Sequence, residues 1–78
     1  MDTVVAAVNC RPYVDKAQSL PENHPEYGRD HLHHMINEIE SGRVAGEKSH
    51  RWLGYLQGVL VSSGAATLEQ MKQTNLNA

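Results

Sequence analysis

The sequence predicts an all-α fold, an antiparallel helical hairpin with a short third helix and a partly irregular N-terminal segment. Two stretches, residues 29–41 and 47–62, carry apolar residues at helical spacing. A turn of five residues joins them, and so short a connection favours antiparallel neighbours. A length of 78 residues allows one domain, in which residues 1–28 form an N-terminal segment and linker and residues 29–78 form the hairpin and the C-terminal helix.

The N-terminal segment has the least regular pattern. Its apolar run from Val4 to Val8 is too short for periodicity to separate a helix from a strand. Pro12 suits the first turn of a helix, so we expect a short helix over residues 12–19. Residues 20–28, LPENHPEYG, hold two prolines and a glycine and are typical of an irregular linker.

The first hairpin helix is expected to begin near Arg29 or Asp30 and to end at Ser41, with Gly42 as the residue that follows its C-cap. Its apolar stripe is expected to pack on leucines of the second hairpin helix. The stripe is Leu32, Met35, Ile36 and Ile39, and the facing leucines are Leu53, Leu56 and Leu60.

The third helix is expected to begin at Thr67. Residues 67–70 match the capping-box pattern, in which Thr67 and Gln70 bond reciprocally to each other's backbone N–H groups. We expect Leu68 and Met71 to be its apolar contacts and residues 73–78 to fray.

Two glycines, Gly54 and Gly58, lie four residues apart inside the second hairpin helix. With His50 and Ser62 they form one row along the helix. Each mid-helix glycine costs roughly 1 kcal/mol relative to alanine, so the pair indicates a close approach to that face. Either a neighbouring helix or subunit packs there, which is the commoner reason for small residues, or the face admits a ligand or a partner's side chain.

Around this row lie the residue types that dominate binding hot spots. A partner would meet Trp52 as an anchor, with a rim of polar and aromatic side chains. The candidate partner-binding residues are therefore His50, Arg51, Trp52, Gly54, Tyr55 and Gly58.

Five histidines offer a metal-binding alternative. His31, His34 and Glu38 share one helical face, and three such ligands suit zinc with an open position. The spacing matches no known zinc motif, so we favour exposed polar positions on a helix as the explanation of these residues.

Composition limits the remaining classes. The single cysteine, Cys10, excludes an internal disulfide and is expected to be a small, partly buried hydrophobe. No phosphate loop, dinucleotide motif or activated nucleophile is recognisable, so we expect no enzyme activity and no cofactor. Seven scattered basic residues and a net charge of −2 argue against nucleic acid as a partner. The absence of a signal peptide or long apolar run indicates the cytoplasm and no membrane partner.

A resemblance covers the C-terminal third to half of the chain. GEKSHRWLGYLQG, Gly46 to Gly58, followed by ATLEQMK, Ala66 to Lys72, resembles small accessory proteins of tailed bacteriophages and prophages. Such proteins commonly bind and inhibit host proteins or host defence systems. The hairpin is also similar to that of phage cyclic-nucleotide sponges, which oligomerise and sequester defence signals.

The resemblance implies a non-enzymatic protein that inhibits a host protein, or an anti-phage defence component, in the cytoplasm of the bacterial host. Self-association is expected because a chain this short buries little core alone. The sponge alternative would hold phosphates near the hairpin turn with Arg43, Lys48, His50 and Arg51.

Overall fold

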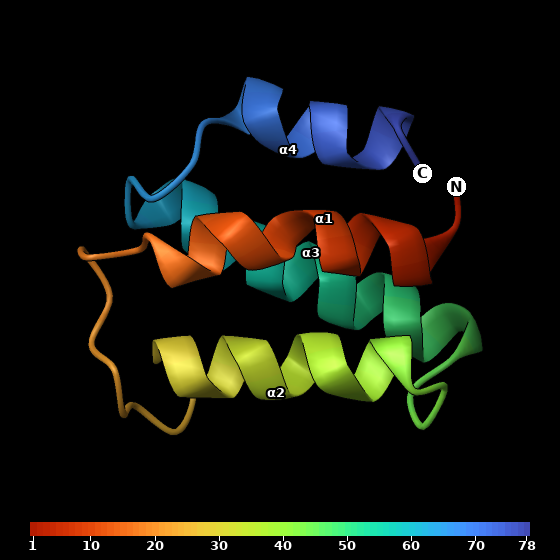
Figure 1. Ribbon diagram of the computed structural model, residues 1–78, viewed down its shortest axis with the longest axis horizontal. Coiled ribbons are helices and arrows are strands. Elements are labelled where there is room, and N and C mark those ends of the chain that lie inside the picture. The colour runs from red at the N-terminus through yellow and green to blue at the C-terminus, as the bar shows by residue number, and fades with distance from the viewer.

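The computed structural model describes all 78 residues as four helices with no strand (Figure 1). The helices are α1 (Thr3–Asp15), α2 (Arg29–Glu40), α3 (Gly46–Ser62) and α4 (Leu68–Leu76). The all-helical class expected from the sequence is confirmed. None of the four combines the length and the apolar character that crossing a membrane requires.

The arrangement places α1 and α3 in the middle, with α2 and α4 on opposite sides (Figure 1). Both α1 and α3 contact every other helix, whereas α2 and α4 do not touch. In Figure 1, α2 runs from left to right and α3 runs from right to left, so the two helices are antiparallel. All four helices contribute to one core, whose largest fully buried side chains are Leu32, Ile36, Ile39, Leu53, Leu56 and Leu60.

The expectation of an irregular N-terminus and a separate helix over residues 12–19 is wrong, because α1 is one continuous helix through Pro12. Asp2 caps it, since its Oδ1 accepts from the N–H groups of Val4 (2.9 Å) and Val5 (3.3 Å). Pro12 removes one hydrogen bond near the end of α1, but its ring lies exposed on the outer side. Burial of the inner face outweighs that loss; its buried residues are Ala6, Ala7, Cys10 and Val14.

The linker between α1 and α2 is irregular, as expected, yet it is held by hydrogen bonds from Arg29. The Arg29 guanidinium donates to the carbonyls of Ala17 (3.2 Å) and Leu20 (2.5 Å). Its backbone N–H donates to the Pro21 carbonyl at 2.9 Å. Since Ala17 and Leu20 are also buried, the linker packs as part of the core.

The expected capping box of α4 is confirmed: Thr67 Oγ1 accepts from Gln70 N at 3.0 Å, and Gln70 Oε1 accepts from Thr67 N at 2.8 Å. The expected fraying of residues 73–78 is wrong, because α4 continues to Leu76. Thr74 in its last turns is buried, and the Ala78 carbonyl accepts from Asp2 N at 3.0 Å.

A partly buried polar cluster joins α1, α3 and α4. Gln57 Nε2 donates to Asn75 Oδ1 (2.8 Å) and Thr74 Oγ1 (3.1 Å), and it lies 3.6 Å from Cys10 Sγ. Asn9 Nδ2 donates to the Thr74 carbonyl at 3.2 Å. Because a partly buried amide loses free energy when it is left unpaired, this cluster favours one seating of α4 on the other two helices.

Among the glycines, Gly28 is the one that needs a close approach. A Cβ atom at Gly28 would lie 2.8 Å from the carbonyl oxygens of Glu22 and His24 and would clash with the backbone nitrogen of His24. The linker therefore folds against the start of α2 only with glycine there.

We predict opposite effects for two Gly→Ala substitutions. Gly28→Ala should lower the free energy of unfolding by about 1–3 kcal/mol, because the new methyl group meets the linker backbone. Gly54→Ala should raise it by about 0.5–1 kcal/mol, because its Cβ would meet nothing within 4 Å and alanine favours the helix. Urea titration of both variants measures the difference, and destabilisation by Gly54→Ala would contradict the open face on α3.

Candidate functional site

The glycine row of α3 points away from the core. His50, Gly54, Gly58 and Ser62 are all exposed. They face outward because the opposite side of α3 carries the buried residues, which are Ser49, Leu53, Leu56 and Leu60. The large apolar side chains thus determine how α3 is oriented, and the glycines are left at the surface.

The expectation that a neighbouring helix of the same chain approaches this row is wrong. A Cβ atom added at Gly54 or Gly58 would meet nothing within 4 Å. Burying leucines stabilises α3 far more than packing against bare backbone, so its neighbours lie on the leucine side. The row is an open strip of helix backbone.

Beside this strip, α3 and α4 enclose an open groove of about 370 Å³. Gly54, Gly58 and Ser62 form one wall, and Leu68 and Lys72 belong to the other; the remaining lining residues are Gln57, Val61, Met71 and Asn75. We call this the α3/α4 groove. A second hollow, lined by Met1, Lys72, Asn75 and Leu76, adjoins it over the end of α4.

Two exposed leucines of α4 border these hollows. Leu68 is 62% exposed and Leu76 is 76% exposed. The expectation that Leu68 packs into the core is wrong, whereas Met71 is buried as expected. Leu68, Lys72 and Leu76 form one row at spacings of four residues, so they share one face of α4, and Lys72 in this row is the sequence signal that the face is exposed. Our sequence-based list of site residues omitted all three.

The six sequence-predicted residues occupy two sides of α3. His50, Gly54 and Gly58 share the exposed row, and Arg51 is exposed next to it. Trp52 lies further round the helix, half-buried against the core, with Lys48 Nζ 5.4 Å from its ring centroid. Because its ring is partly covered by its own chain, Trp52 is placed as a packing residue at the edge of the face.

Tyr55 connects α3 to the linker. Its hydroxyl donates to the Glu26 carbonyl at 2.5 Å, although 44% of the residue is exposed. Next to Glu26, the Tyr27 ring stacks on His24 with a centroid distance of 3.6 Å. Tyr55 therefore has a structural contact as well as an exposed ring face.

The residues of the metal-binding alternative do not assemble. His34 Nε2 lies 3.6 Å from Glu38 Oε1, and Glu38 also pairs with Arg43. The His31 and His34 ring centroids are 6.2 Å apart. The structure has no group of three or more His, Cys, Asp or Glu side chains placed to hold a metal ion, so this alternative gains no support.

Two of the four residues proposed to bind phosphate near the hairpin turn make other contacts within the chain. Arg43 pairs with Glu38, and Lys48 lies over Trp52. His50 and Arg51 remain exposed on α3. No convergent cationic pocket forms at this turn.

Cys10 is fully buried, in agreement with its expected role as a small hydrophobe. Burial raises the pKa of the Cys10 thiol above its ordinary value, and hydrogen bonding with Gln57 and Thr74 offsets part of that rise. A thiol held neutral away from solvent is a poor nucleophile.

Comparison with known proteins finds no match: no family model, no curated protein and no solved structure resembles the chain.

The raised pKa of Cys10 predicts a loss of stability at alkaline pH. The folded state keeps its proton at pH values where the unfolded thiol has lost it, so the contribution is complete below the unfolded pKa and falls as the pH rises towards the folded pKa. The slope is at most about 1.4 kcal/mol per pH unit. Urea titrations from pH 7 to 10 should show a steeper decline for the wild type than for Cys10→Ala. Parallel curves would contradict the prediction.

Substitution of Leu68 and of Met71 should distinguish a surface position of α4 from a core position. Leu68→Ser should change the free energy of unfolding by less than about 0.5 kcal/mol, because Leu68 lies largely in solvent. Met71→Ser should cost more than about 2 kcal/mol, because Met71 is 2% exposed. Thermal unfolding followed by circular dichroism measures both, and a large loss for Leu68→Ser would mean that the groove is closed in solution.

Proposed function

We propose that this protein is a phage-encoded, non-enzymatic binding protein that inhibits a bacterial host protein or a component of host anti-phage defence. It docks its target in the host cytoplasm, on the exposed face of α3 and in the α3/α4 groove. The phage origin and the inhibitory role rest on the resemblance of residues 46–72.

The observation that carries the proposal is the open glycine row beside two exposed leucines. Gly54 and Gly58 weaken α3 without admitting any neighbour within the protein. Bare backbone next to apolar side chains suits an incoming helix, whose own side chains can approach closely there. Leu68 and Leu76 supply the apolar contacts along α4.

The rim of the face supplies the residues that orient a partner. Arg51 and His50 are exposed at one end of α3, and Lys72 lies on the α4 side of the groove. Tyr55 is 44% exposed, and Trp52 packs partly buried against the core at the edge of the face. Arg and aromatic side chains contribute more than their share of binding free energy at protein interfaces.

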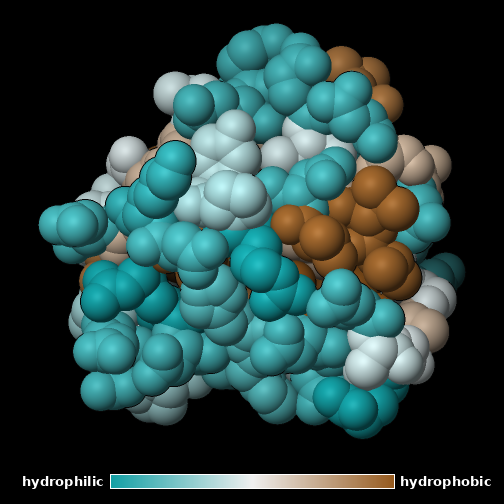
Figure 2. Space-filling model, viewed as in Figure 1, coloured by the Kyte–Doolittle hydropathy of each residue, from teal (hydrophilic) through white to brown (hydrophobic).

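Self-association is part of the proposal and has its own surface. An apolar patch covers the N-terminal half of α1 in the hydropathy view (Figure 2), where Val4 and Val5 are 37% and 40% exposed. This patch lies on α1, so two copies joined through it would leave the face of α3 free for a target.

Gly58→Leu is the direct test of the docking face. The leucine fills the groove without touching the core, so the helix content should stay as in the wild type while target capture is lost. Tagged wild type and variant are each incubated with bacterial lysate, and native mass spectrometry of the eluates reports bound protein and the number of copies.

Gln18→Leu is the matched control, because Gln18 is exposed on the linker between α1 and α2. The proposal requires a stoichiometric host protein with the wild type and with Gln18→Leu, and none with Gly58→Leu. Equal capture by all three would move the docking face elsewhere, and a bare homo-oligomer in every eluate would remove the inhibitor proposal.

A further inference from the structure

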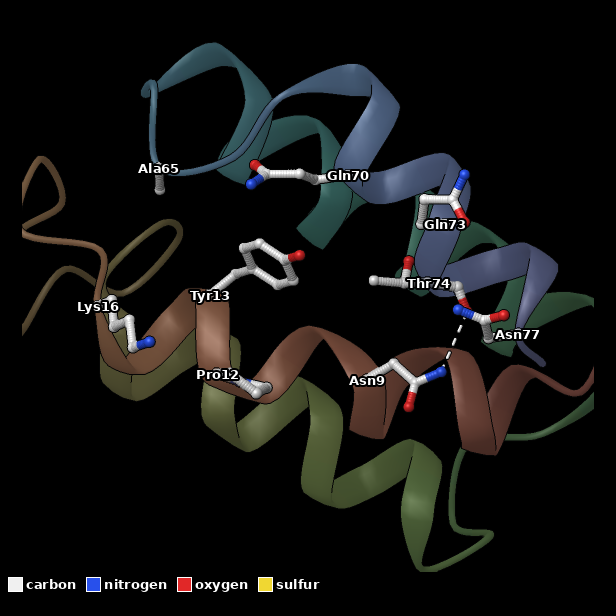
Figure 3. A pocket seen from close by; sticks show the side chains of 9 residues that line it. All are labelled: Asn9, Pro12, Tyr13, Lys16, Ala65, Gln70, Gln73, Thr74 and Asn77. Carbon is white, nitrogen blue, oxygen red and sulfur yellow. Dashed lines mark hydrogen bonds between the residues drawn. The ribbon is translucent and has the colours of Figure 1, made fainter.

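A separate, larger groove lies between α1 and α4, away from the glycine row. Its volume is about 690 Å³, within the range of small-molecule sites. We call it the α1/α4 groove. Side chains from both sides line it (Figure 3): Asn9 and Tyr13 from α1 with Lys16 at the C-cap of that helix, and Gln70 and Gln73 from α4 with Asn77 at its C-cap.

The spacing on each side explains why the side chains converge. Asn9 and Tyr13 are four residues apart on one side of α1, and Lys16 follows three residues later at the C-cap. Gln70 and Gln73 are three residues apart on α4, and Asn77 follows four residues later at its C-cap. Because α1 and α4 pack together, these two sets of side chains form the opposite walls of one groove.

Tyr13 provides a flat wall. Its ring projects from α1 towards α4 in the middle of the groove (Figure 3). One part of the side chain packs against the core and holds the ring in place, while the residue remains half-exposed. A fixed, accessible aromatic face is a stacking platform for a planar ring.

The amides around Tyr13 retain both donors and acceptors. Gln70 uses its Oε1 in the capping box, which leaves its NH₂ group. Gln73 donates its NH₂ group to Glu69 at 3.3 Å, which leaves its carbonyl. Asn9 donates to the Thr74 carbonyl, which leaves Oδ1. Side-chain amides are the groups that pair with the N6/N7 edge of adenine.

The charge in the groove is that of a single cation. Lys16 is exposed where the groove meets the C-terminal end of α1, and no Asp or Glu is among the residues that line the groove. The chain as a whole carries a net charge of −2. An anionic group is therefore attracted to the Lys16 end and meets no carboxylate along the groove.

We propose that the α1/α4 groove binds an adenine nucleotide. The base stacks on Tyr13 and is recognised along its edge by the amides of α4, and the phosphate pairs with Lys16. This chemistry is shared by free adenosine monophosphate and by a terminal adenylate of a single strand. The α1/α4 groove shares no lining residue with the α3/α4 groove.

Isothermal titration calorimetry of the full chain tests the site with adenosine monophosphate, adenosine, inorganic phosphate and a pentamer of deoxyadenylate. We expect the monophosphate to bind, adenosine to bind more weakly, and phosphate alone to give no heat. Binding of the pentamer more than tenfold tighter than the monophosphate would identify the strand as the source, and comparable binding would identify the free nucleotide.

Three variants distinguish binding of the nucleotide in the α1/α4 groove from non-specific attraction of its phosphate to any surface lysine. Tyr13→Leu keeps apolar packing but removes the ring, and it should weaken monophosphate binding roughly tenfold. Lys16→Gln, at an exposed position that leaves the fold intact, should weaken the monophosphate but leave adenosine unchanged. Lys72→Gln, the same change in the other groove, should have no effect.

Absence of heat with both the monophosphate and the pentamer would overturn the proposal. So would equal affinities of wild type and Lys16→Gln for the monophosphate, or equal loss with Lys16→Gln and Lys72→Gln. Guanosine monophosphate binding as tightly as the adenine nucleotide would overturn the recognition by the α4 amides.

Discussion

The burial of α1 between the other three helices is the contact on which the whole structure depends. Its inner face is made of Ala6, Ala7, Cys10 and Val14, all without solvent exposure. These small side chains let α1 come close to α2 and α3, so that the larger residues of those helices fill the space around it. Without α1, the linker, α2 and α4 would each lose their main packing partner, since α2 and α4 do not touch.

The second constraint is the polar cluster that seats α4. Helices α2 and α3 dock through leucine and isoleucine, but α4 buries only Met71 and Thr74. Hydrogen bonds from Gln57 to Thr74 and Asn75 supply the geometric specificity that so few apolar residues do not. This arrangement fixes one orientation of α4, and that orientation creates a groove on each side of it.

The features that could be predicted from the sequence are those set by helical periodicity or by a local motif. The stripes of α2 and α3, the glycine after α2 and the capping box of α4 were all readable, because each is a local pattern. Gly42 has a φ of 81°, as its expected position after the helix end requires. These features depend on neighbours in sequence and need no tertiary information.

Other features could not be read locally. The α1 segment has weak amphipathic character and contains Pro12, so only its tertiary burial shows it to be one helix. The glycine row was identified, but whether a neighbour covers it depends on the positions of α1, α2 and α4. The clash that makes glycine necessary at Gly28 arises from a linker fold that no periodicity encodes. Leu68 looked like a core residue because apolar type alone does not separate an inner from an outer stripe.

The shared use of α4 as a wall has a thermodynamic consequence. Because it is a nine-residue helix held by two buried residues and a polar cluster, we expect α4 to be the helix that opens at the lowest free-energy cost. Any molecule that binds either groove binds only while α4 is docked, so it stabilises the docked state. To the extent that α4 undocks in the free protein, a ligand in one proposed groove would raise the affinity of the other, by the same factor in both directions. The two proposed binding surfaces on opposite sides of one short helix would then be coupled without any change in the docked structure.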